Sequence, residues 1–316
     1  MRGGFFCFRI PGSSPRMTRG FMKLLLLGTG TSHGIPVIGC DCAVCKSQDK
    51  RDKRFRAAAL FTTAAGTNIL IDVGPDFRMQ ALEHNIKKLD AVLLTHSHAD
   101  HLHGLDDLRI FSCDMWKKPD NPAALKQFNA PAIPVYTNAS TIRDLTYRFA
   151  YFFVPVKEGG GHARVELKEA DGPFVVDEVT ITPIPMMHGH LETVGWLFTR
   201  TDSDGTKKSI AYLTDCNFIS EQSFDLIKKA AAVDKGGIIE ELVIDGLRIK
   251  PHSTHFSILQ AMQAADTIGV KNMWITHMTH NSSHVEYTEY MNEHKDEFAN
   301  IKGSAEPAFD GLLLEV

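Results

Sequence analysis

The stretch DAVLLTHSHADHLHGLDDLR, residues 90 to 109, holds the densest group of metal-ligating side chains in the chain. Four potential ligands fall within six positions: His96, His98, Asp100 and His101. They follow the apolar run 91–94, which has the length of a buried strand. A turn after a strand can direct alternate side chains at one point, so we expect His96 and His98 to share one ion and Asp100 and His101 to reach a second. Imidazole and carboxylate together suit zinc, manganese or iron.

This H-x-H-x-D-H turn resembles the signature of the metallo-β-lactamase superfamily. The resemblance implies an α/β fold, a four-layer αββα sandwich with the metals at one edge between two sheets. Short strands and helices alternate through both halves of the chain, as that fold requires. The fold also supplies a third metal-binding histidine at a strand end. His188 and His190 are both available, and His188 occupies the position that matches the family.

Two further ligands follow apolar runs, Asp215 after 209–213 and His277 after 273–276. A carboxylate at 215 can bridge two ions. The expected set is therefore His96, His98 and His188 for one ion, Asp100, His101 and His277 for the other, and Asp215 between them. A hydroxide held between two ions about 3.5–4 Å apart is the expected nucleophile. Asp72 either caps the turn before Gly74 or, as the superfamily implies, orients a metal ligand from behind.

A leaving ester oxygen needs a proton, and two histidines in PHSTHFS (251–257) are placed to supply it. His255 is the first candidate and His252 the second. A histidine with a near-neutral pKa suits proton donation or phosphate binding. His255 and Asp100 are the predicted catalytic residues.

Three thiols, Cys40, Cys42 and Cys45, form the pattern C-x-C-x2-C. They can converge on one tetrahedral zinc that takes a fourth ligand from elsewhere. The pattern follows Leu27–Gly30, and His255 lies 22 residues before His277 in T-H-M-T-H. Together these features resemble the phosphoribosyl 1,2-cyclic phosphate phosphodiesterase of phosphonate breakdown, from about residue 22 to the C-terminus.

That resemblance implies a structural zinc on the three thiolates and His280. It also implies a dinuclear site, often with manganese, on the seven ligands above, and a catalytic histidine at His255. The expected cofactors are thus two divalent ions, zinc or manganese, and one structural zinc.

Composition limits the partners. The formal net charge of −4 argues against a broadly basic nucleic-acid surface, although a local patch stays open. No apolar run reaches the 18 residues of a membrane span. Six cysteines, three of them clustered, indicate a reduced cytoplasmic setting rather than a disulfide framework. We expect a small-molecule phosphodiester as substrate and no membrane partner; a homodimer stays open.

The domain organisation is expected to be a disordered extension over 1–21 and one hydrolase domain over 22–316. Residues 117–132 read as an inserted flap, and 159–161 as a glycine-rich loop. The basic stretch 50–56 is either a solvated loop or a rim that attracts phosphate.

Three alternative functions remain. A tRNA 3′-processing endonuclease shares the spacing of His255 and His277 but lacks the thiol cluster and carries a tRNA-binding arm that this sequence does not show. A thioester or lactone hydrolase uses the same dinuclear site but does not need His255. A non-catalytic zinc protein would be expected to have lost some of the seven ligands.

Overall fold

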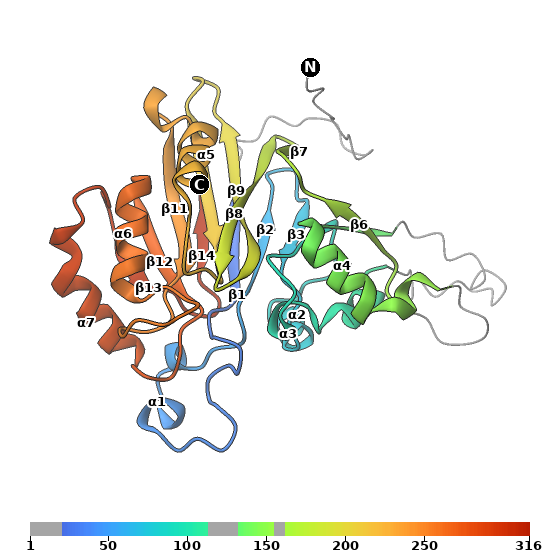
Figure 1. Cartoon of the computed structure of the whole chain (residues 1–316), viewed down its shortest axis with the longest axis horizontal. Coiled ribbons are helices and arrows are strands. Elements are labelled where there is room, and N and C mark those ends of the chain that lie inside the picture. The colour runs from blue at the N-terminus through green and yellow to red at the C-terminus, as the bar shows by residue number, and fades with distance from the viewer. Residues whose placement is uncertain (1–20, 113–131, 155–161) are drawn as a thin grey trace.

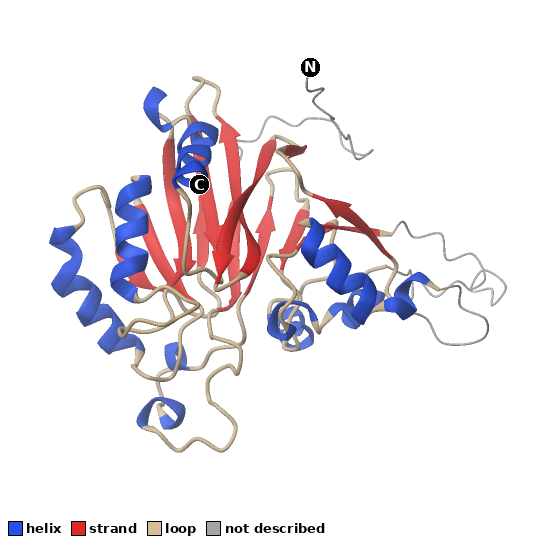
Figure 2. Cartoon of the chain, in the orientation of Figure 1, coloured by secondary structure: helices blue, strands red, loops and turns tan. Residues whose placement is uncertain are grey.

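The computed structural model describes residues 21–112, 132–154 and 162–316. Within these ranges the strands form two seven-stranded sheets that face each other, with helices on the outer faces (Figures 1 and 2). This arrangement confirms the predicted αββα sandwich. None of the described helices is long and apolar enough to cross a membrane.

The first sheet has the order β14-β1-β2-β3-β4-β5-β6. Its strands are β1 (Lys23–Gly28), β2 (Ala58–Thr62), β3 (Asn68–Ile71), β4 (Ala91–Leu93), β5 (Ile133–Thr137), β6 (Val165–Glu169) and β14 (Leu313–Glu315). The second sheet has the order β13-β12-β11-β10-β9-β8-β7. Its strands are β7 (Phe174–Val176), β8 (Val179–His188), β9 (Leu191–Thr201), β10 (Lys207–Leu213), β11 (Ile238–Asp245), β12 (Asn272–Thr276) and β13 (Ala305–Pro307).

Large aromatic side chains join the two sheets. Phe61 of β2 stacks on Phe198 of β9 with ring centroids 4.0 Å apart, and Trp196 and Tyr212 are fully buried beside them. Burial of such rings is the main contribution to the stability of a core. Central strands such as β10 are apolar on both faces because the helices cover their outer side.

Helices cover each outer face. On the first sheet lie α2 (Phe77–Glu83) and α4 (Ala139–Arg148), and on the second lie α5 (Glu221–Ala231), α6 (Ile258–Ile268) and α7 (His284–His294). Hydrophobic periodicity does not predict α7, because this helix is polar around most of its surface and buries only His284, Tyr287 and Met291. Its start carries a capping box, in which Ser283 and Glu286 bond each other's backbone N–H groups.

The H-x-H-x-D-H turn continues as a helical turn α3 (Ala99–Leu102) and a 3-10 segment over 105–110. In the basic stretch, Arg54 is neither solvated nor on a rim, because it is 3% exposed and donates hydrogen bonds to Thr29 Oγ1 (2.7 Å) and the Ala308 carbonyl (2.6 Å). The expected extension over 1–21 and the flap over 117–132 lie, apart from Phe21 and Ala132, outside the described residues, and so does the loop 159–161.

Candidate metal centre

All seven expected metal ligands lie at carboxyl ends of strands. The turn with His96 follows β4, His188 ends β8, Asp215 follows β10 and His277 follows β12. Strands β10, β11 and β12 are parallel neighbours, so their carboxyl ends meet at one edge. The first sheet presents β3 and β4, also parallel, at the same edge. Side chains from distant segments therefore converge between the two sheets.

The structure brings these ligands together as two groups. His96, His98, His188 and Asp215 have ligand atoms within 4.8 Å of one another, and so do Asp100, His101, His277 and Asp215. Asp215 belongs to both groups, which is the position expected for a bridging carboxylate. His190, the alternative to His188, is exposed and belongs to neither group.

The distances fit metal coordination. Nε2 of His101 lies 3.2 Å from Asp215 Oδ2 and 3.2 Å from Asp100 Oδ2. Nε2 of His277 lies 3.3 Å from Asp215 Oδ1, and Nε2 of His96 lies 3.6 Å from Asp215 Oδ2. Two ligands that each stand 2.0–2.2 Å from one ion are about 3.0–3.6 Å apart. Each spacing falls in this range.

Buried nitrogens without hydrogen-bond partners also indicate a metal site. Among the described residues, Nε2 of His96, His101 and His277 are buried and have no hydrogen-bond partner. An unsatisfied buried polar atom costs about 1–3 kcal/mol, so three at one point would be a large defect in a protein without ions. A divalent cation would satisfy all three, and the donor set therefore fits the group that the fold implies.

Backbone strain collects at this centre. Asp72, Asp215 and His277 have φ values of +62°, +54° and +60°, a left-handed conformation that side chains other than glycine rarely adopt. Such strain persists only where the surrounding structure fixes it, and it is common at functional sites. Gly74 brings the loop after β3 against the metal turn; a Cβ there would stand 2.0 Å from the Asp100 carbonyl oxygen.

Hydrogen bonds from Nδ1 orient two of the metal-binding imidazoles. Nδ1 of His101 donates to Asp72 Oδ2 (2.8 Å), and Nδ1 of His188 donates to the Thr254 carbonyl (2.6 Å). Asp72 also accepts from the Thr95 backbone N–H at 2.8 Å. With Nδ1 committed, each Nε2 is left free for an ion. Asp72 thus lies where the ligand-orienting role places it.

Asp215, the residue shared by both ligand groups, carries a negative charge. Burial would raise the pKa of Asp215, but the neighbouring His101 and His277 outweigh it and hold that pKa well below the ordinary value. The residue is therefore a carboxylate, the form that binds cations.

His255 lies beside the ligands and is held by Asp245, which sequence reasoning did not single out. Its Nδ1 donates to Asp245 Oδ2 at 2.6 Å, and its ring stacks on His277 with centroids 4.8 Å apart. Burial lowers the pKa of His255, but Asp245 outweighs burial, and the net direction is upward. The available signal was an acidic residue at the end of an apolar strand, the same signal that identified Asp215. His252 is more distant from the centre, with its ring 5.4 Å from that of His255.

The thiol cluster forms a second, separate group. Sγ of Cys40, Cys42 and Cys45 each lie 3.4 Å from Nδ1 of His280. One imidazole nitrogen has a single lone pair or a single proton, so three hydrogen bonds to it are excluded. In a tetrahedral zinc site, with Zn–S about 2.3 Å and Zn–N about 2.05 Å, sulfur and nitrogen stand about 3.6 Å apart. The four atoms therefore have the spacing of a closed zinc site.

The thiols differ in acidity. The backbone N–H of Cys45 lowers the pKa of Cys42 to about 6, whereas burial raises the pKa of Cys45 to about 11. Cys42 is then a thiolate at neutral pH, which is the form that ligates metal.

Comparison with known proteins identifies the class. A profile of the Beta-lactamase superfamily domain matches residues 67–278, which is more than half of the chain. The chain therefore belongs to the beta-lactamase superfamily. It has the metallo-β-lactamase fold and is a metal-dependent hydrolase, and that fold implies divalent metal ions.

Individual relatives carry different descriptions. A solved structure described as a new diphosphatase from the PhnP family is 33% identical, covers 93% of this chain and 98% of its own, and has a TM-score of 0.73. Zn²⁺-bound PqqB from Methylobacterium extorquens is 16% identical, covers 93% and 100%, and has a TM-score of 0.67; it supports the fold alone. A Porphyromonas gingivalis protein named octanoyltransferase is 35% identical over 277 residues, 86% of this chain and 49% of that relative. This chain thus spans about half the length of the latter.

Proposed function

We propose that the chain hydrolyses phosphodiester bonds in a small molecule, with cyclic phosphodiesters as the foremost class. The observation that carries the proposal is the hydrogen bond of 2.6 Å between Asp245 and His255 beside the two ligand groups. A proton donor next to the metals serves the departure of an alkoxide. The likeness to a protein described as a diphosphatase supports phosphoryl chemistry.

The chain's own residues then have distinct tasks. When bound, two divalent ions supply an activated water and neutralise charge on phosphoryl oxygens. Asp215 is shared by both ligand groups and so fixes their separation. Asp245 accepts a hydrogen bond from His255 Nδ1–H, which orients the ring and leaves Nε2–H to protonate the leaving oxygen. The thiol cluster, as a closed zinc site, takes no part in the reaction.

Turnover of a panel of phosphodiesters tests this proposal. Protein loaded with zinc or manganese should cleave nucleoside 2′,3′-cyclic phosphates and bis(p-nitrophenyl) phosphate, and Asp215→Asn should abolish both activities. If the metal-loaded wild type releases no product from any cyclic or linear phosphodiester, the proposal is wrong.

A thioester hydrolase is the second candidate, because one relative is named octanoyltransferase, an enzyme of acyl transfer. Thioester cleavage releases a thiolate, a good leaving group that needs no proton donor. An octanoyl thioester cleaved at an equal rate by wild type and His255→Ala would favour this candidate over the phosphodiesterase.

A further inference from the structure

The three histidines of one ligand group, His96, His98 and His188, differ in how firmly the protein holds them. We call the ion that they would share the first ion. Nδ1 of His188 donates to the Thr254 carbonyl, and Nδ1 of His96 lies 2.9 Å from the Thr95 hydroxyl oxygen. His98 is exposed, and no hydrogen bond within the described residues reaches its Nδ1. Its direction therefore depends on the backbone of the turn that carries it.

Helix α4 supplies no ligand, but it bonds the residue next to His98. Ser97 donates from its hydroxyl to Asp144 Oδ2 at 2.5 Å, and its carbonyl accepts a hydrogen bond from Nη1 of Arg148. Asp144 and Arg148 are one helical turn apart and form an ion pair of 3.8 Å with each other. Hydrogen bonds to charged partners are stronger than neutral ones. One helix thus holds both the side chain and the carbonyl of Ser97.

The same helical segment contacts the metal loop further along the chain. After α4 comes a 3-10 segment, Ala150–Phe153, from which Tyr151 donates to Asp106 Oδ2 at 2.5 Å. Phe149, directly after α4, is buried and meets the ring of His103 edge-on, with centroids 5.8 Å apart. Contacts at successive places in the loop therefore align this helical segment with the loop that carries four of the ligands.

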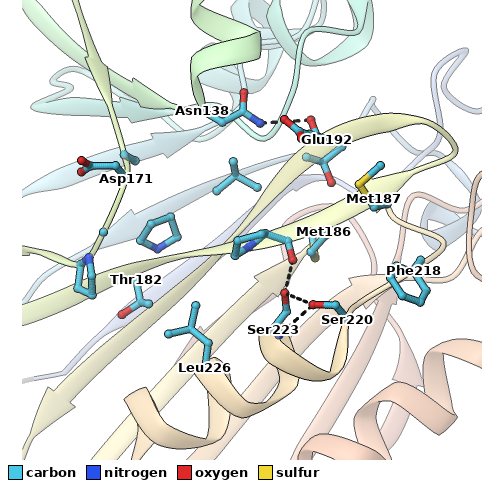
Figure 3. A pocket seen from close by; sticks show the side chains of 17 residues that line it. Asn138, Asp171, Thr182, Met186, Met187, Glu192, Phe218, Ser220, Ser223 and Leu226 are labelled. Carbon is cyan, nitrogen blue, oxygen red and sulfur yellow. Dashed lines mark hydrogen bonds between the residues drawn. The ribbon is translucent and has the colours of Figure 1, made fainter.

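The start of α4 contacts the second segment that supplies a ligand of the first ion. Asn138, the N-cap residue, accepts from the Thr141 backbone N–H at 2.8 Å and donates from Nδ2 to the Glu192 carbonyl at 3.2 Å. Figure 3 shows the contact between Asn138 and Glu192. Glu192 pairs with Met187, the residue before His188, in the β8–β9 hairpin. Helix α4 therefore contacts both segments from which the histidines of the first ion come.

We propose that α4 is a positioning helix for the first ion, in which Asp144 and Arg148 hold Ser97 so that His98 points at the metal position. The affinity for the first ion then depends on a helix that supplies no ligand, whereas the affinities of the second ion and of the thiol cluster do not. The inference rests on the candidate metal centre and not on the substrate. A failure of the proposed phosphodiesterase activity would leave it intact.

Zinc binding to the full chain tests the proposal without turnover. The number of ions bound per chain is measured at free zinc concentrations set by a competing chelator, and His98→Ala identifies the binding step of the first ion. Arg148→Met should weaken this step about 10-fold, the lower end of the effect of residues that orient a metal ligand, and leave the other steps unchanged. Arg148→Lys can still donate to the Ser97 carbonyl and should restore part of the affinity.

The sign of this effect separates positioning from simple electrostatics. Loss of a positive charge near a bound cation should strengthen cation binding, so a purely electrostatic role of Arg148 predicts the opposite result. Arg143→Met is the matched control, because Arg143 lies on the same helix, is exposed and forms no hydrogen bond with another described residue. It should bind the first ion at least as tightly as the wild type does.

Two neutral replacements of Asp144 separate the hydrogen bond from the charge. Asp144→Asn and Asp144→Ala remove the same charge, but only asparagine keeps an oxygen that can accept from the Ser97 hydroxyl. Asp144→Ala should therefore weaken the first ion more than Asp144→Asn does. Alanine favours the helix, so this pair decides the question if Arg148→Met does not fold.

Several results would overturn the proposal. They are a first ion bound as tightly by Arg148→Met as by the wild type, equal weakening of every ion, the same weakening in Arg143→Met, no recovery in Arg148→Lys, and equal affinities of the two Asp144 variants. A wild type without a zinc ion that depends on His98 would refute the candidate metal centre together with this inference.

Discussion

At the scale of single residues, the chemistry depends on which nitrogen of each histidine the protein leaves free. Carbonyl and carboxylate oxygens can only accept, so the contacts of His101, His188 and His255 require a proton on Nδ1. Nε2 of His101 and His188 is then left free to hold an ion. In His255 the charge of Asp245 favours the imidazolium, which keeps a second proton on Nε2.

His255→Ala should retain both active-site ions and lose about 10²–10⁴ in kcat/KM, the usual contribution of a proton donor. The loss should shrink for a substrate with a nitrophenolate leaving group, because that oxygen needs no proton. Metal analysis and rates across a series of leaving groups check this. A uniform loss would instead indicate phosphate binding, and loss of an ion would make His255 a ligand.

Asp245→Asn should reproduce this dependence on the leaving group with a smaller loss, because Asp245 orients His255. The side-chain oxygen of Asn can still accept from the Cys216 backbone N–H, as Asp245 Oδ2 does at 2.9 Å. Combined with His255→Ala, Asp245→Asn should add almost nothing, since residues that act as one unit are not additive. Additive losses in the double variant would show that Asp245 has an independent role.

At the scale of elements, the thiol cluster joins two segments far apart in the chain. The Cys40–Cys45 segment follows β1, and His280 follows β12. A zinc ion at this point would fasten the loop that carries both His277 and His280.

Cys42→Ser should lower the melting temperature by about 5 °C or more, because binding of a structural zinc contributes several kcal/mol to folding. The kcat of the folded fraction should change little, since a closed site has no position for substrate. Asp41→Asn is the control, because Asp41 lies between the thiols but is exposed and makes only a surface ion pair with Lys46. A Cys42→Ser protein with unchanged stability and no turnover would place this zinc in catalysis.

The start of α7 predicts a dependence of stability on pH. Arg54 donates from Nη2 to Nδ1 of His284 at 3.2 Å, so this buried imidazole must be neutral. Burial, then the charges of Arg54 and Arg51, lower the pKa of His284 to about 4. The folded protein resists protonation there while the unfolded chain accepts it near pH 6.5. The stabilisation is therefore complete above pH 6.5 and is lost as pH falls towards 4.

His284→Gln should remove this contribution, because an amide oxygen can accept from Arg54 but does not titrate. The free energy of unfolding of the wild type should fall relative to the variant by up to about 3 kcal/mol between pH 7 and pH 4. Denaturant titrations at several pH values, with metal in excess, measure the difference. Parallel pH curves for the two proteins would contradict the assignment.

At the scale of the whole molecule, the candidate centre spans the two sheets. His96, His98, Asp100 and His101 come from the edge of the first sheet, and His188, Asp215 and His277 from the second. Ions held there link the two halves of the sandwich, so metal content and global stability should be coupled.

Metal-loaded protein should contain about three ions per chain, two at the dinuclear site and one on the thiols. Chelation should then lower the melting temperature, because each site filled at 1,000 times its dissociation constant stabilises the folded state by about 4 kcal/mol. His255→Ala should bind the same number of ions, and chelation should lower its melting temperature by the same amount as in the wild type. One ion or fewer beyond the thiol zinc would refute the dinuclear site.

The sequence alone determined the features that are local. Each of the seven expected ligands, and Asp72, sits at the end of an apolar run, and a strand end can be recognised from neighbouring residues. The H-x-H-x-D-H turn, which resembles the signature of the metallo-β-lactamase superfamily, lies within six positions of the chain. The sandwich architecture followed from that resemblance and from the alternation of strands and helices.

Tertiary structure alone decided which distant segments meet. Asp245 ends β11, and His255 lies ten residues further on in a loop whose course cannot be derived from spacing. The sequence assigns His280 to the thiols by resemblance only. Arg54 looked like one more charge in a basic run, although its partners lie near residues 29, 284 and 308. Such contacts depend on packing between elements, which local propensity and periodicity do not encode.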